Sequence, residues 1–344
     1  MVKYSVENYE RVLEKAGQFI RGLQNRDGSV KGIKQDTFWG YYSQPLALRG
    51  LGSSEDSNRA NRCINYIKRN FLNTDGSVKL VTESRWTEKV IAGDLYAAAF
   101  LIHGAVVWER FDVAGPMIKY LLRFQDKESG GIFHRTRNRR LIEASTTADA
   151  GIGMIMTGHI EEAQKAGRFF IKIHDSQPDS DSRYLTTWDT QKKELFDGDT
   201  DVIDIPDSSL IRENPKGANT YWEAGYIMIF MVYLYNVTGK KKYLKVAEEL
   251  FEIVSSYKDF EFHIWKTPWA CARLYQTTGE QKYLDTARIM ADQIVNMQQS
   301  DGGFSPGSSA RPEYSYSELQ SDIVELADVA CQLTYFLSEV RAIL

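Results

Sequence analysis

The hydrophobic and polar positions of this chain divide it into twelve helical segments of two alternating kinds. Six segments carry charged residues on one face, which is typical of surface helices; they cover about 7–24, 56–71, 113–125, 159–174, 240–256 and 280–298. The six between them are apolar nearly all round, which is typical of buried helices; they cover about 38–51, 92–108, 145–157, 220–237, 266–277 and 322–343. This alternation predicts an all-α fold, a closed (α/α)6 barrel or toroid, as a single domain over residues 1–344.

Two internal repeats also predict an array of helical hairpins. Residues 234–239 and 274–279 both read Leu-Tyr-x-x-Thr-Gly, and each is followed by Tyr-Leu-x-x-Ala. A second repeat is an Asp-Gly or Gly-Gly turn that closes a helix, and it occurs near residues 25–29, 73–77, 125–131 and 298–303. Glycine supplies the positive φ that such a helix stop requires.

The connections differ in length. Those from an inner to the next outer helix are short, such as Thr157-Gly158. Those from an outer to the next inner helix are long, and they cover 25–37, 72–91, 126–144, 175–219, 257–265 and 299–321. All long loops therefore gather at one end, around the N-termini of the inner helices. Long loops tend to be functional and helix N-termini offer free N–H donors, so we expect the functional site there.

The Gln-x-x-Asp-Gly turns at Gln24 and Gln298 resemble the repeat of the terpenoid cyclase and protein prenyltransferase α/α-toroid superfamily. The Leu-Tyr-x-x-Thr-Gly unit is similar to one in sugar-processing (α/α)6 enzymes, such as acylglucosamine epimerases and unsaturated glucuronyl hydrolases. Both resemblances imply a toroid, but they are architectural and leave the reaction open.

The composition of the chain narrows the range of binding partners to expect. The chain is 43% hydrophobic and 26% charged, with a net charge of −4, so a large core is expected and a nucleic-acid partner is not. The three cysteines are far apart in helical patterns, which favours reduced thiols. No apolar signal region begins the chain, and the longest apolar run, 224–235, is too short to span a bilayer. We predict a cytoplasmic protein with a small-molecule substrate; the oligomeric state is left open.

The longest loop holds the densest carboxylates. Its Asp197-Gly198-Asp199-Thr200 run resembles the Asp-x-Asp-Thr motif of class II terpenoid cyclases, which implies that Asp199, with Asp201 beside it, is the proton donor. Crowded like charges raise one carboxyl pKa, which suits an acid catalyst. In that family an apolar helix follows the motif, whereas 202–217 is a loop with two prolines. A solvated acidic turn is therefore the alternative.

Carboxylates also occur in the apolar inner segments. Asp149 lies near the start of one, where it can point to the axis as a catalytic acid or simply interact with the helix dipole. Glu223 lies one turn into the most apolar segment, and burying a lone carboxylate is costly. It is thus a candidate acid or base, with a structural ion pair as the alternative. Asp94, nearer its helix end, is a candidate substrate ligand.

Basic residues suggest further contacts. His263 enters the fifth inner helix and is a candidate acid or base, because histidine titrates near neutral pH. Lys266 follows it as a candidate substrate ligand. Arg135 belongs to a basic cluster that suits an anionic group, or that is an exposed charged hairpin.

Aromatic residues crowd the loop end, and they suit carbocation stabilisation, sugar stacking or a large apolar ligand. The candidate ligand-binding aromatics are Trp39, Tyr41, Trp86, Tyr96, Trp188, Tyr221, Trp222, Trp265 and Trp269.

No zinc-ligand spacing of the prenyltransferase kind, phosphate-binding glycine loop or Gly-x-Ser-x-Gly motif is present, so neither a metal nor a cofactor is predicted. The first hypothesis is a cyclase or isomerase that acts by acid/base catalysis on a largely apolar, terpenoid- or polyketide-like metabolite. The alternatives are a carbohydrate-active epimerase, hydrolase or lyase, and a non-catalytic binding toroid. A cyclase requires one strong acid within apolar walls, whereas a sugar enzyme requires polar groups that face one another.

Overall fold

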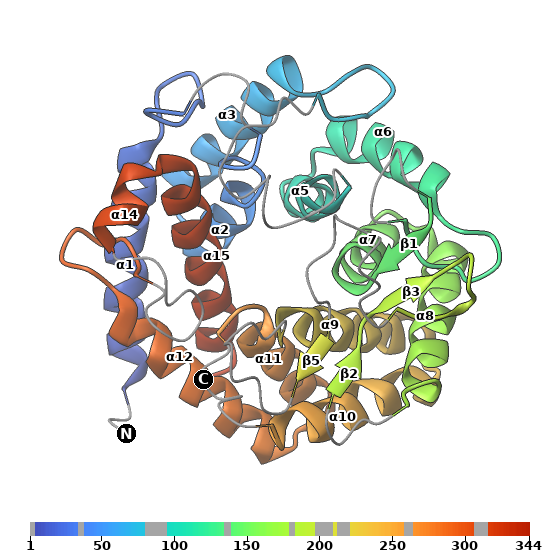
Figure 1. Cartoon of the computed structure of the whole chain (residues 1–344). Coiled ribbons are helices and arrows are strands. Elements are labelled where there is room, and N and C mark those ends of the chain that lie inside the picture. The colour runs from blue at the N-terminus through green and yellow to red at the C-terminus, as the bar shows by residue number, and fades with distance from the viewer. Residues whose placement is uncertain are drawn as a thin grey trace.

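The computed structural model describes residues 4–33, 38–79, 95–133, 139–178, 183–196, 209–211, 221–257, 264–305 and 316–344. In these ranges, twelve α-helices form two concentric rings (Figure 1). The inner ring consists of α2 (Gln44–Leu51), α5 (Tyr96–Val107), α7 (Ala144–Met156), α9 (Tyr221–Thr238), α11 (Thr267–Thr278) and α15 (Ile323–Arg341). The outer ring consists of α1 (Val6–Leu23), α3 (Ser54–Asn70), α6 (Phe111–Leu121), α8 (Ile160–Asp175), α10 (Lys241–Ser255) and α12 (Gln281–Met297).

Helix contacts close the inner ring. Each inner helix touches the next one along the chain, and α15 packs against α2. Every outer helix packs against the inner helix that precedes it, with α1 packed against α15. The predicted (α/α)6 toroid is therefore confirmed. A 3-10 turn, η1 (Leu122–Phe124), extends α6, and the short helix α14 (Tyr316–Ser321) precedes α15.

Burial follows the two predicted helix types. The inner helix α5 is buried at every position from Tyr96 to Ala105. The outer helix α10 buries only one stripe, which includes Tyr243, Ala247 and Leu250, and its charged face is solvated. The core therefore lies between the two rings and along the axis. None of the helices in the described ranges is long and apolar enough to cross a membrane.

The repeated glycine turns join neighbouring outer helices. We call them the repeat turns: residues 24–30, 72–78, 125–132 and 298–304, each closed by a β-bridge between its ends. Three glutamine side chains in them donate to backbone carbonyls of the next outer helix, and the pairs are Gln24 with Arg59, Gln125 with Glu162 and Gln298 with Val12.

Each repeat turn has one glycine with positive φ, and it touches the same neighbouring helix; these are Gly28, Gly76, Gly130 and Gly302. A Cβ at Gly28 would lie 2.2 Å from the Arg62 carbonyl oxygen, and one at Gly302 would lie 2.4 Å from that of Lys15. Only glycine fits so close to another backbone. The residues of this sequence repeat thus hold consecutive outer helices in contact.

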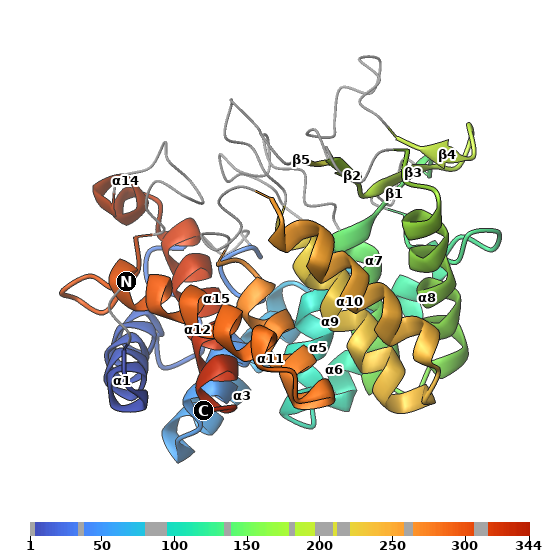
Figure 2. The same cartoon turned by 90° about the horizontal axis from the view of Figure 1, so that it is seen from below.

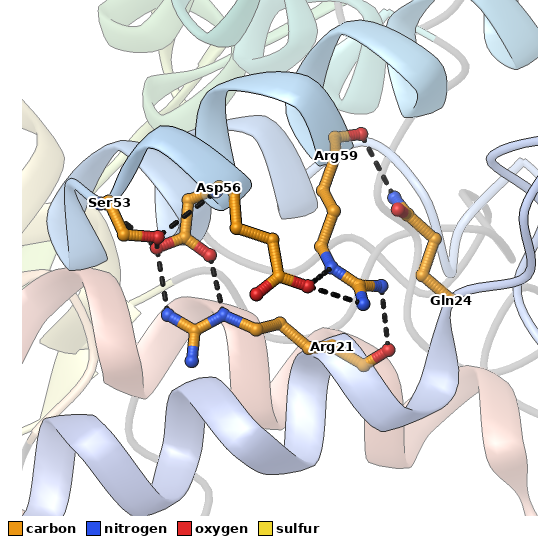
Figure 3. Close-up of polar contacts among 6 residues, drawn as sticks. Arg21, Gln24, Ser53, Asp56 and Arg59 are labelled. Carbon is orange, nitrogen blue, oxygen red and sulfur yellow. Dashed lines mark hydrogen bonds and ion pairs between the residues drawn. The ribbon is translucent and has the colours of Figure 1, made fainter.

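Figure 3 shows the joint between α1 and α3. The Arg21 guanidinium donates two hydrogen bonds, both 2.8 Å, to the buried Asp56 carboxylate. Asp56 also accepts a bond from the Ser53 hydroxyl, with which it forms the N-terminal capping box of α3. Burial alone would raise the pKa of Asp56, but the bonds from Arg21 and Ser53 lower it below its usual value. The carboxylate therefore stays charged and holds the two helices together.

Five short strands in the connections are absent from the sequence prediction. Strand β3 (Thr187–Asp189) pairs antiparallel with β1 (Leu141–Glu143) and β4 (Glu194–Leu195), and β2 (Arg183–Leu185) pairs with β5 (Ser209–Ile211). They gather at one end of the toroid (Figure 2).

The first inner helix is also shorter than predicted. Residues 39–43 form turns, and α2 begins at Gln44 because Pro45 suits only the first turn of a helix.

Candidate functional site

The end that carries the strands also carries the starts of inner helices. Strand β1 runs directly into α7, and β3 pairs with β1 in the same sheet (Figure 2). Thr186, between β2 and β3, donates a hydrogen bond from its hydroxyl to the Glu223 carboxylate in the first turn of α9. The predicted gathering of the long connections around the inner N-termini is therefore confirmed.

Buried polar side chains from several inner helices meet near the ring axis at this end. We call them the axial polar cluster: Tyr42, Tyr96, Asp149, Tyr226, Lys266 and Asp328, all between 0 and 6% exposed. The Tyr96 and Tyr226 hydroxyls are 2.7 Å apart and link α5 to α9. The Asp328 carboxylate of α15 accepts hydrogen bonds from the Ser43 hydroxyl at 2.9 Å and from the Tyr42 hydroxyl at 3.3 Å.

Asp149 is the least satisfied member of the cluster. It lies in the second turn of α7 with no exposed surface, and neither carboxyl oxygen has a hydrogen-bond partner among the described residues. Burial raises the pKa of Asp149 well above its ordinary value, and the charge of Lys266 opposes this only in part. The surroundings therefore favour a protonated carboxyl that can give up a proton.

Lys266 brings a cation into the same cluster. It caps α11 with a left-handed backbone, φ 60°, and is 5% exposed. Its Nζ lies 5.1 Å from the ring centroid of Tyr226, 5.5 Å from that of Trp265 and 5.9 Å from that of Tyr96. These distances are within the range of cation–π attraction.

Two further carboxylates mark the starts of neighbouring inner helices. Glu223 of α9 is 2% exposed, with the Thr186 hydroxyl bonded to one oxygen. Glu143, at the N-cap of α7, accepts hydrogen bonds from the hydroxyls of Ser145 and Thr146. Helices α7 and α9 are in contact, so Asp149, Glu143 and Glu223 belong to one side of the ring.

Below the polar cluster, side chains fill the axis. The His103 ring of α5 stacks 5.5 Å from the Trp269 ring of α11, and Tyr335 meets Trp269 edge-on at 5.2 Å. Since α5 and α11 are opposite in the ring, these rings meet across the axis. Burial, together with the charge of Arg273, lowers the pKa of His103 to about 3, so the imidazole is neutral. We call His103, Trp269, Tyr335 and Phe336 the axial plug.

The predicted aromatic residues whose side chains the structure describes are at four places. Trp39 is half-buried and stacks on Tyr96 with centroids 5.9 Å apart, and Trp265 is beside Lys266, so both border the polar cluster. Trp269 is completely buried in the plug.

Two other aromatics are away from the axis. Tyr41 packs on Tyr66 of α3 and accepts a hydrogen bond from the Val30 backbone, so it belongs to the core beside a repeat turn. Trp188 lies on β3, with the Lys172 ammonium of α8 3.8 Å from its ring centroid.

Other predicted site residues are outside the described residues: Trp86, Asp94, Arg135, Asp199, Asp201 and His263. Tyr221 and Trp222 lie in the first turn of α9, but their side chains are also outside the description. The hypothesis of a proton donor in the acidic loop therefore stays a prediction. Among the described residues there is no group of three or more His, Cys, Asp or Glu side chains that could hold a metal ion.

Sequence reasoning missed Tyr226, Asp328 and Glu143 as site residues and did not place Tyr42 in a polar cluster. The signal for Asp328 was the same as for Glu223, a carboxylate within an apolar helix. Tyr42 and Tyr226 carry no such signal, because tyrosine is equally at home in a core.

No protein-family model and no curated protein matches the chain. Among solved structures, it resembles the family 76 α-1,6-mannanase of Salegentibacter sp. HEL1_6, with TM-score 0.67, 12% identity, and coverage of 97% of this chain and 99% of that one. An inactive variant of that enzyme, with two neighbouring aspartates replaced, was solved with α-1,6-mannotriose.

Two more matches are of the same kind. A family 76 α-mannanase of Bacteroides thetaiotaomicron matches at TM-score 0.66 and 14% identity over 97% of this chain and 96% of that one. An unsaturated glucuronyl hydrolase specific for heparin matches at TM-score 0.61 and 12% identity over 98% and 96%. These likenesses agree with the predicted resemblance to sugar-processing toroids and give no support to the terpenoid cyclase resemblance. At sequence identities this low, the likeness to these proteins shows a shared fold and nothing about activity.

Proposed function

We propose that this protein is a carbohydrate-active hydrolase in which Asp149 donates a proton to a glycosidic bond. The observation that carries the proposal is the Asp149 carboxyl, which is buried, protonation-prone and without a hydrogen-bond partner among the described side chains. Glycosidases prepare their general acid in this way, by raising the pKa of a carboxyl. The names of the structural neighbours, mannanases and a glucuronyl hydrolase, support a sugar as substrate.

Glycoside hydrolysis needs a second carboxylate as base or nucleophile. Glu223 is our choice because it is buried at the start of α9, next to α7, with one oxygen fixed by Thr186. In the proposed step, the Asp149 proton moves to the glycosidic oxygen as the bond to the anomeric carbon breaks. Glu223 takes a proton from a water molecule, whose oxygen then bonds to that carbon.

The surroundings of Asp149 favour this reaction over the cyclase hypothesis. A cyclase needs apolar walls around one strong acid, whereas Asp149 shares its cluster with an ammonium, three phenol hydroxyls and the Asp328 carboxylate. Such groups suit a hydroxyl-rich substrate, and the half-buried Trp39 provides a ring on which a sugar face can stack. The chain has no two consecutive aspartates, so the aspartate pair of the mannanase is not reproduced and we do not propose mannan as the substrate.

The first test is turnover of a glycan panel that includes α-1,6-mannooligosaccharides and unsaturated uronic-acid disaccharides. We expect Asp149→Asn to lower kcat by roughly 10²–10⁴-fold, the usual contribution of a general acid. Chromatography with mass detection checks the products. Hydrolysis adds one water, whereas a lyase leaves a double bond that absorbs ultraviolet light.

Asp56→Asn is the matched control, because Asp56 is equally buried but lies in the outer ring (Figure 3). It should lower stability and leave the activity per folded molecule unchanged. Full activity of Asp149→Asn would remove Asp149 from the reaction, and products with a new double bond would replace hydrolysis by elimination.

A further inference from the structure

The backbone around Lys266 is unusual. Among the described residues, only Glu109, Lys193 and Lys266 combine a side chain with positive φ, and Lys266 alone of these is buried. A left-handed residue with a Cβ is unfavourable, and such strain gathers at functional sites. Lys266 has this conformation at the start of an inner helix, where its side chain is directed into the axial polar cluster.

A glycine on the neighbouring helix holds this geometry in place. A Cβ at Gly225 of α9 would lie 2.9 Å from the Thr267 nitrogen and 3.0 Å from the Lys266 Cβ. The backbones of α9 and the start of α11 are therefore in direct contact, and nothing larger than glycine fits between them. The position of Lys266 is a consequence of this close approach.

The Lys266 ammonium and the Asp149 carboxyl border the same pair of phenols. The ammonium lies over the rings of Tyr226 and Tyr96, from the adjacent helix and from the opposite one. Burial is the main cause that raises the pKa of both tyrosines, and the charge of Asp149 raises them further. Asp149 on α7 thus acts electrostatically on the same two tyrosines over whose rings the Lys266 ammonium lies.

We propose that Lys266 is a positioning residue that acts through Asp149: its ammonium, held over the tyrosine pair in the axial polar cluster, stabilises the Asp149 carboxylate and so helps the carboxyl to release its proton. The inference rests on the proposed function of Asp149 as a proton donor. An acid that is only buried holds its proton too firmly to donate it, and a nearby cation corrects this by stabilising the carboxylate.

The charged and titratable groups that face Asp149 belong to the inner ring. Lys266, before α11, acts on the charge of Asp149, and Asp149 in turn acts on Tyr96 of α5 and Tyr226 of α9. Tyr42 and Asp328 act in turn on Tyr96. Glu143 and Glu223 occupy the starts of α7 and α9. In this set Lys266 is the cation, so removing its charge should change the pKa of Asp149 more than removing any other group of the set.

The test compares Lys266→Met, which keeps the length and removes the charge, with Lys266→Arg, which keeps the charge. Infrared difference spectra over a pH range follow the protonated carboxyl stretch of Asp149, assigned by its loss in Asp149→Asn. We expect the titration midpoint in Lys266→Met to rise by about one pH unit or more, and that in Lys266→Arg to stay near wild type. The alkaline limb of the pH–kcat profile should move to higher pH by the same number of pH units. The decrease in kcat should be larger than the change in KM.

An unchanged Asp149 midpoint in Lys266→Met would overturn the proposal, whatever its effect on activity. A shifted midpoint in Lys266→Met, together with a wild-type protein that cleaves no glycan, would support the coupling of Lys266 to Asp149 and reject the proposed hydrolase. Lys266→Gln serves as a second uncharged variant, and near-ultraviolet circular dichroism establishes that each variant is folded.

Discussion

At the scale of single residues, Asp149 lowers the stability of the folded protein when its carboxyl is charged. A buried carboxyl without a hydrogen-bond partner among the described groups is unfavourable when charged, which is why burial raises its pKa. Asp56 is equally buried, but Arg21 and Ser53 satisfy it and lower its pKa. One aspartate stabilises the structure at neutral pH, and the other weakens it.

This contrast predicts how stability depends on pH. The pKa of Asp149 is higher in the folded than in the unfolded protein, where it is about 3.9. The folded state binds the extra proton, so the contribution is complete below pH ~4 and is lost as pH rises towards the folded pKa. Asp149→Asn should therefore raise Tm at pH 7 and have little effect near pH 4. Tm measured by circular dichroism across this range checks the prediction, and a Tm loss at pH 7 would show that the charged carboxyl has a stabilising partner.

At the scale of elements, glycines with positive φ are found both in the repeat turns and in the short turns from inner to outer helices. In the repeat turns, the glycines touch the backbone of the next outer helix, as Gly28 does at Arg62. In the short turns from inner to outer helices, Gly158, Gly239 and Gly279 have similar φ, but a Cβ there would meet nothing within 4 Å. The short turns require glycine only for its backbone conformation. The repeat turns require it both for that conformation and because a side chain would clash with the next outer helix.

The two settings provide a matched pair of variants. Gly158→Ala should cost about 1–2 kcal/mol of unfolding free energy, the penalty of a left-handed alanine. Gly28→Ala adds a contact of 2.2 Å with a carbonyl oxygen, and should cost about 3 kcal/mol or more because the α1–α3 joint must shift. Urea unfolding measures both. Equal losses would show that the repeat turns do not hold the outer helices in place.

At the scale of the whole molecule, the two ends of the chain lock the ring. The Tyr9 hydroxyl of α1 donates a 2.5 Å hydrogen bond to Asp292 of α12, and the Gln298 side chain reaches the Val12 carbonyl. Helix α15 packs on both α1 and α2. The first and last helices are therefore neighbours in the closed ring (Figure 1).

This closure predicts that the chain unfolds as one domain. Calorimetry should show a single transition with equal calorimetric and van't Hoff enthalpies. Asp292→Asn, at the seam, should lower the Tm of the entire transition because it weakens the bond from Tyr9. Two separate transitions, or a lower Tm for one half of the molecule only, would contradict the single domain.

The amino-acid sequence by itself determined the helices, their order in two rings and the end at which the long connections meet. These features depend on a periodicity of 3.6 residues and on glycine at turns, both of which are local. It also indicated Asp149 and Glu223, because a carboxylate in an apolar helix is conspicuous wherever it occurs. The short strands were missed, since segments of two or three residues carry no readable alternation.

Only the tertiary structure decided which side chains meet at the axis. Tyr96 and Tyr226 are 130 residues apart, and Tyr42 and Asp328 are 286 apart, yet each pair shares a hydrogen bond. Trp269 was expected beside a ligand and is in the axial plug, because α11 turns its ring towards His103 on the opposite helix. Ring closure sets such contacts through the rotation of each helix about its own axis. Nearly uniform apolar patterns do not encode that rotation, so it follows from the packing of all twelve helices together.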